Sequence, residues 1–157
     1  MNKEQKLKLI VKEDSFHKTK YGSVTGVIYF DVDGFLFPEQ DWDDFVVSLL
    51  VCFSRILVML KFDKNKNIDV LFQEGPFKVS IELDKENQCT ISFIEGEKLA
   101  GDKEIIYKTI TIPFESLKKE IVKSCSKALQ IKDPKKMSFN EDYRDLEKAY
   151  SLLLKVS

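Results

Sequence analysis

The strongest constraint on the fold lies in the middle of the chain, where apolar residues recur at every second position. A period of two is typical of β-strands, because successive side chains of a strand point to opposite faces. The connections between these runs are too short to hold the crossover helix that parallel pairing needs. We therefore predict an antiparallel meander of four strands, at Ile68–Phe72, Phe77–Leu83, Cys89–Ile94 and Ile105–Ile112.

Two further strands are predicted before the meander. Residues 6–11 alternate between polar and apolar side chains, and residues 23–30 are rich in β-branched and aromatic ones. The Asp33-Gly34 pair is a hairpin turn signal, so Phe35–Phe37 is expected to return as a short third strand. Pro38 ends that strand, because proline has no amide proton to donate to a neighbouring strand.

The longest apolar segment predicts a helix between Asp41 and Lys61. Apolar residues recur there every three or four positions, and Asp41 is suited to cap the N-terminus. Two amphipathic segments predict C-terminal helices, one over residues 116–130 and one around Leu146.

The size and composition of the chain complete the predicted fold. It has 157 residues, of which 43% are hydrophobic, enough for one well-buried core. We predict a single domain over residues 1–157, of the α+β class. In this fold an antiparallel sheet of about six strands packs against one long apolar helix, with two C-terminal helices.

The three cysteines, Cys52, Cys89 and Cys125, are odd in number and widely spaced. They therefore favour neither a disulfide framework nor a zinc site. Each has apolar neighbours, which predicts buried free thiols in a reducing cytoplasm. His17 is the single histidine, which excludes most histidine-based catalysis and metal binding. We expect no catalytic residues, no cofactor and no bound metal.

Overall charge and hydropathy narrow the class of partner. The net charge is −1 and the isoelectric point about 5.9, which does not indicate a nucleic-acid-binding protein. Phe45–Leu60 is almost entirely apolar, but its 16 residues include Arg55. A bilayer span needs roughly 20 residues, so we predict a buried helix here and no membrane partner.

The local distribution of charge indicates protein binding. Residues 21–60 hold six acids and one base, a net of −5, whereas residues 1–20 have a net of +3. Acids steer a basic partner into place, and aromatic side chains among them anchor it. The candidate partner-binding residues are Asp31, Asp33, Phe35, Phe37, Glu39, Asp41, Trp42, Asp43 and Asp44. Helix capping and solubility would also explain the last three acids, and the sequence leaves both interpretations open.

The apolar strand that ends in Asp31-Val32-Asp33-Gly34 resembles the first motif of the haloacid-dehalogenase-like phosphatases. That resemblance implies a small Mg²⁺-dependent phosphatase, with Asp31 as the nucleophile and Asp33 as the general acid and base. Phe35 stands where that family has threonine. The predicted meander also departs from the parallel sheet of that family. The phosphatase is therefore kept as an alternative function.

Three short motifs lie between residues 28 and 83. They are Phe37-Pro38, then Trp42-x-Asp44 followed by the apolar helix, then Phe72-x-x-Gly75-Pro76-Phe77. This stretch resembles small bacterial immunity proteins, the antidotes carried beside polymorphic toxins. The resemblance implies a protein that binds and blocks a cognate toxin, and it assigns no residue a role.

The sequence as a whole predicts a non-enzymatic protein-binding domain of this immunity type. Its expected partner is another protein, a toxin domain with a basic surface that complements the acidic segment. The alternatives are the phosphatase, using Asp31 and Asp33, and a housekeeping scaffold subunit.

Overall fold

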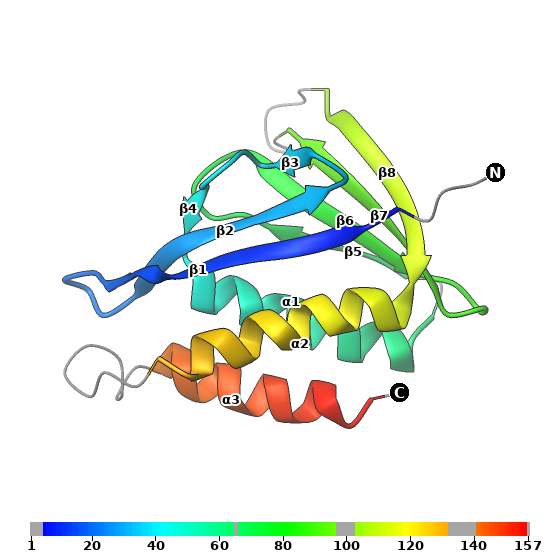
Figure 1. Cartoon of the computed structure of the whole chain (residues 1–157). Coiled ribbons are helices and arrows are strands. Elements are labelled where there is room, and N and C mark those ends of the chain that lie inside the picture. The colour runs from blue at the N-terminus through cyan, green and yellow to red at the C-terminus, as the bar shows by residue number, and fades with distance from the viewer. Residues whose placement is uncertain (1–4, 65, 97–102, 132–140, 157) are drawn as a thin grey trace.

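The computed structural model describes residues 5–64, 66–96, 103–131 and 141–156. In this part of the chain, two four-stranded antiparallel sheets lie on one side and three helices on the other (Figure 1). The prediction of an α+β fold with antiparallel strands and three helices is confirmed. The prediction of one sheet of about six strands is wrong, because the strands divide between two sheets.

Sheet A is built around β2, which pairs with β1 along one edge and with β3 and β4 along the other. Its strands are β1 (Leu7–Lys18), β2 (Val24–Val32), β3 (Phe35–Phe37) and β4 (Asp43–Asp44). The turn predicted at Asp33-Gly34 joins β2 to β3, and both of its residues have positive φ, 51° and 93°. A two-residue type I′ hairpin turn requires positive φ at both central positions.

Sheet B is the predicted meander, and its strands pair in chain order. They are β5 (Asn67–Leu71), β6 (Phe77–Leu83), β7 (Gln88–Glu95) and β8 (Ile105–Pro113). Each bound agrees with the predicted one to within one residue. The prediction succeeds here because the pairing is local: each strand returns directly beside the one before it.

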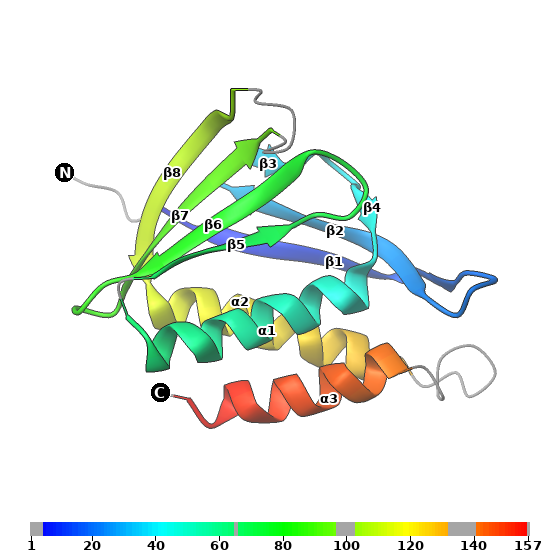
Figure 2. The same ribbon diagram turned by 180° about the vertical axis from the view of Figure 1, so that it is seen from behind.

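Three helices of 17, 16 and 14 residues form the other layer: α1 (Val46–Phe62), α2 (Phe114–Leu129) and α3 (Glu141–Leu154). α1 lies beneath both sheets, α2 lies along β1, and α3 packs on both helices (Figures 1 and 2). The predicted arrangement, one long helix against the sheet with two C-terminal helices, is therefore wrong, because α2 also packs on a strand. α1 and α3 run in the same direction, and α2 runs opposite to them. None of the described helices has both the length and the apolar character of a membrane span.

The core lies between the two sheets and α1. The Phe30 ring of β2 is 5.5 Å from the Phe53 ring of α1 and 5.6 Å from the Phe93 ring of β7, centroid to centroid. One side chain thus joins sheet A, sheet B and the helix layer. Full burial of such a side chain stabilises the fold by roughly 1.5–3 kcal/mol. α1 is apolar on most of its surface because the sheets cover one side and α3 covers another.

α1 begins later than the sequence predicts. Its first residue is Val46, so Asp41 is not its N-cap, and Asp43–Asp44 form β4 instead of a first helical turn. The backbone before α1 pairs with β2, where the Ile28 amide donates to the Trp42 carbonyl at 2.9 Å. The backbone of these residues forms hydrogen bonds with a neighbouring strand. The spacing of apolar residues along the segment cannot indicate such pairing.

Two of the three cysteines are buried as predicted. Burial raises the pKa of Cys89 to about 12 and that of Cys125 to about 11, so both thiols stay protonated at neutral pH. Cys52 is exposed on α1, contrary to the prediction. Its apolar sequence neighbours point to other sides of the helix, so they do not bury it.

Candidate protein-binding site

The predicted site begins at the turn between β2 and β3. Asp31 Oδ1 accepts a hydrogen bond from the Gly34 amide at 2.9 Å, which closes the turn. Asp33 is exposed, and its Oδ2 accepts a hydrogen bond from the Lys6 amide at 3.3 Å. β2 is antiparallel to its neighbours on both edges, whereas the phosphatase resemblance implied a parallel sheet. In this structure both carboxylates accept hydrogen bonds that hold the turn.

Asp44 is buried, with 1% of its surface exposed. Its carboxylate accepts hydrogen bonds from the Trp42 indole nitrogen (2.9 Å) and from three backbone amides, those of Phe45 (2.7 Å), Gln73 (3.0 Å) and Glu74 (3.2 Å). A carboxylate that loses its hydration needs such donors. Asp44 therefore ties the start of α1 and the loop after β5 to sheet A, and it presents no surface to a partner.

Lysines of β1 lie among the predicted acids. Lys12 forms an ion pair with Asp41, and that hydrogen bond raises the pKa of Lys12. Lys8 lies directly opposite Asp31 in the register of β1 and β2. The net charge of −5 found in the sequence is thus partly neutralised in space, because antiparallel pairing brings the basic first segment against the acidic second one.

The three aromatic candidates occupy different depths. Phe37 is 1% exposed, and its ring packs 5.2 Å from that of Phe93, so it belongs to the core. Phe35 and Trp42 are partly buried and pack against the edge of that core. Trp42 packs edge-on against Phe77, at 5.3 Å between ring centroids. Two of the three rings therefore retain surface for a partner.

The candidate residues that keep exposed surface lie at the end of β2, in the turn after it, and along the edge of sheet A formed by β3 and β4 (Figure 1). We call this set the acidic rim. It consists of Asp31, Asp33, Phe35, Glu39, Trp42 and Asp43. Phe37 and Asp44 are excluded because they are buried, and Asp41 because its charge is paired.

Side chains from the far end of sheet B adjoin the rim, and sequence analysis did not identify them. The Tyr107 ring lies 6.5 Å from that of Phe37, and its hydroxyl donates a hydrogen bond to Glu95, which raises the pKa of Tyr107. Lys108 Nζ lies 5.9 Å from the centroid of the Phe35 ring. Only the packing of β8 beside β3 brings these residues together, so no motif or spacing could have indicated them.

The motifs behind the immunity-protein resemblance form one packed cluster. The Phe37 and Trp42 rings both contact that of Phe77, at 5.6 and 5.3 Å, and Asp44 holds the intervening loop. A Cβ added at Gly75 would lie 3.0 Å from the Trp42 ring, so the loop approaches that ring as closely as glycine permits. These residues share a structural role, which is to hold the loop between β5 and β6 against β4.

The chain matches no protein-family model, no curated protein and no solved structure. Within the described ranges, no three His, Cys, Asp or Glu side chains are placed to hold a metal ion. A cavity of about 360 Å³ lies between the start of β1 and the start of α2. Its lining includes Lys6, Lys8 and Lys119 and no residue of the acidic rim.

Proposed function

We propose that this chain is a non-enzymatic protein-binding domain of the immunity type, which binds and blocks a toxin domain through the acidic rim. The observation that carries the proposal is the placement of exposed carboxylates beside partly exposed aromatic rings on one sheet edge. Asp33, Glu39 and Asp43 supply negative charge, and Phe35 and Trp42 supply apolar contact area. Charges of this kind speed and orient the encounter with a basic partner, and aromatic side chains contribute much of the binding energy.

The order of the rim also supports binding. The Gly34 amide bonds to Asp31 and closes the turn beside Phe35, and the Trp42 indole is held by Asp44. A surface that is already fixed loses little conformational entropy when a partner binds. The class of partner follows from the sequence resemblance, and its basic character follows from the charge of the rim.

The first test is a native pull-down of the tagged protein from its source cells, with bound proteins identified by mass spectrometry. We expect a stoichiometric partner that contains a basic domain. The affinity of that purified domain is then measured by calorimetry for the wild type and for Asp33→Lys combined with Asp43→Lys. Because close charge pairs across an interface couple by about 1.5 kcal/mol or more, affinity should fall at least ~10-fold.

Glu82→Lys combined with Glu147→Lys is the matched control. It makes the same change in net charge at exposed acids of β6 and α3, outside the rim. We expect it to bind as the wild type does. An equal loss in both variants would show that net charge matters and the rim does not, and unchanged affinity of the rim variant would remove the rim from the interface. A pull-down without any partner would count against an antidote.

A further inference from the structure

The last turns of α1 expose two apolar side chains. Met59 is 55% exposed and Phe62 is 84% exposed. They continue the stripe of α1 that carries the exposed Arg55, because residues three, four and seven apart share a helix face. The buried positions of α1 lie on its other sides, so the core does not use these two side chains.

α3 adds a third apolar side chain beside them. Arg55 Nη2 lies 3.9 Å from Asp145 Oδ1, which fixes where α1 and α3 meet. The two helices run in the same direction (Figures 1 and 2). Seven residues further on, each helix has risen about 10.5 Å and returned to nearly the same face, which places Phe62 level with Leu152. Leu152 is 54% exposed. We call Met59, Phe62 and Leu152 the Phe62 patch.

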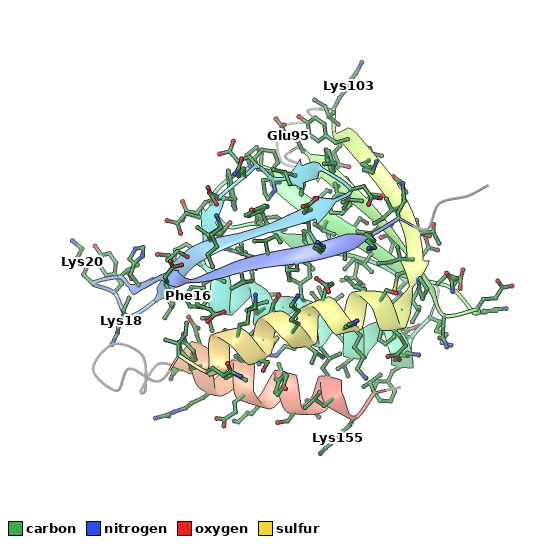
Figure 3. All side chains as sticks on the ribbon, in the orientation of Figure 1. Phe16, Lys18, Lys20, Glu95, Lys103 and Lys155 are labelled. Carbon is green, nitrogen blue, oxygen red and sulfur yellow. The ribbon has the colours of Figure 1, made fainter. Side chains whose placement is uncertain are left out.

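Lysines are frequent in the two segments that carry this patch. Residues 59–66 and 147–155 contain two acids, Asp63 and Glu147, and five lysines, for a net charge of +3. The lysines are Lys61, Lys64, Lys66, Lys148 and Lys155. Figure 3 shows Lys155 pointing away from the body of the protein at the end of α3. The adjoining turn between β6 and β7, residues 84–86, is net −1, so the three segments together keep a net charge of +2.

The negative ends of the helix dipoles explain part of this arrangement, because they favour lysine in the last turn of a helix. Three of the lysines are also held in place: Lys61 and Lys64 both donate to Asn87 Oδ1, at 3.1 and 3.2 Å, and Lys66 forms an ion pair with Asp63 at 2.8 Å. Neither fact accounts for Phe62, which gains nothing from the dipole and is left in water. Three exposed apolar side chains on segments with a net positive charge call for an occupant that is apolar and negatively charged.

We propose that the Phe62 patch docks this protein on an anionic phospholipid surface. A fluid bilayer accepts protruding apolar side chains without a complementary pocket, and its acidic headgroups match the lysines. The sequence-based expectation of no membrane partner concerned a helix that spans the bilayer. Surface docking needs only the shallow insertion of a few side chains, so it is compatible with the 17-residue α1. The acidic rim takes no part in this contact.

The test is flotation of the intact protein with vesicles of phosphatidylcholine, alone or mixed equally with phosphatidylglycerol. We expect binding to the anionic vesicles at low salt and its loss at high salt or on neutral vesicles. Each lysine near an anionic surface raises partition about 5-fold, so Lys148→Glu combined with Lys155→Glu should lower it at least ~10-fold. Met59→Ser combined with Phe62→Ser should also lower it about 10-fold, through lost apolar insertion.

Tyr21→Ser is the matched control, because Tyr21 is also 84% exposed but lies in the loop between β1 and β2. It should bind vesicles as the wild type does. No flotation with anionic vesicles at low salt would overturn the proposal, as would equal binding by the Met59→Ser, Phe62→Ser variant. Sedimentation as a dimer without lipid, abolished by the same double variant, would assign the patch to a second copy instead. The variant Asp33→Lys combined with Asp43→Lys should still float with anionic vesicles. The lipid-docking proposal can therefore be tested independently of the proposed role of the acidic rim.

Discussion

The outer faces of the two sheets both contact water, but they do so with different kinds of side chain. On sheet A, Lys8 and Lys12 of β1 lie among the acids of β2 and of the segment before β4. On sheet B, hydroxyl side chains pair across the strands: Thr90 with Thr111 at 3.2 Å, and Ser92 with Thr109 at 3.0 Å. The first face thus pairs opposite charges, and the second pairs neutral hydroxyl groups across two of its strands.

Sheet B also carries charged side chains, and the most enclosed of them is Lys78, whose side chain is only 4% exposed although it lies on the outer face. Its ammonium lies 3.3 Å from Asp69 Oδ2 and also forms an ion pair with Glu104. Its charge is therefore enclosed by two carboxylates, whereas Lys12 and Asp41 on sheet A are each about half exposed. Screening by water makes the exposed pair weak and leaves the enclosed one stronger. This contrast shows that the number of charges on a face does not measure their contribution to stability.

The largest expected effect is at Asp44, where the two sheets are joined. Asp44→Ala would leave the Trp42 indole and three partly buried amides without their acceptor. We expect a loss of about 3–5 kcal/mol in the free energy of unfolding, measured by urea titration. Asp43→Ala, at the exposed neighbouring position, should cost less than about 0.5 kcal/mol. Similar losses in both variants would contradict the role given to Asp44.

A smaller effect is expected at Gly26, on the inner face of sheet A. A Cβ there would lie 2.6 Å from the Phe16 ring and 3.2 Å from Val46 Cγ1. The four strands of sheet B contain no glycine, so this constraint belongs to sheet A. Gly26→Ala should cost about 1–3 kcal/mol of unfolding free energy through overpacking. The cost should shrink in a Phe16→Leu background, and the same cost in both backgrounds would show that the Phe16 ring is not the obstacle.

The enclosed lysine of sheet B predicts an effect that depends on pH. Burial lowers the pKa of Lys78, but the hydrogen bonds and charges of Glu104 and Asp69 together raise it above its usual value of 10.5. The ion pairs therefore stabilise the fold fully below pH 10.5, and that stabilisation is lost as the pH rises through the higher folded-state value.

Lys78→Met should accordingly lower the free energy of unfolding by about 1–2 kcal/mol at neutral pH. The loss is smaller than for an ion pair with fully buried partners, because both carboxylates are partly exposed. The difference from the wild type should narrow in strongly alkaline buffer. Urea titrations at several pH values measure it, with the exposed Lys123→Met as control. A difference that stays constant up to strongly alkaline pH would mean that the ion pairs contribute nothing.

The smallest effect is expected for the exposed pair of sheet A. Lys12→Ala and Asp41→Ala should each leave the urea midpoint unchanged within error, because water and salt screen an exposed pair. A double-mutant cycle at low and high salt measures the coupling between the two side chains. A coupling as strong as that of Lys78 would remove the contrast between the two outer faces.

Sequence patterns were sufficient where the chain pairs with its immediate neighbours. The four strands of sheet B and the turn at Asp33-Gly34 were predicted with nearly correct bounds. The same patterns failed before α1, where Asp43–Asp44 pair with β2 instead of starting the helix. Pairing across a distance in sequence leaves no local period, so the sequence could not show that the strands divide into two sheets.

For the candidate site, the sequence determined which residue types are present. The tertiary structure decided which of these residues are exposed and which are buried or paired. An excess of acid between residues 21 and 60 is a property of the chain. Strand pairing decides which of two adjacent acids faces water. As a result Asp43 is exposed, whereas Asp44 is buried among hydrogen-bond donors from distant segments. Side-chain charge and local period belong to the sequence. Burial and charge pairing depend on which distant residues come into contact, and that is fixed only when the sheets and helices pack together.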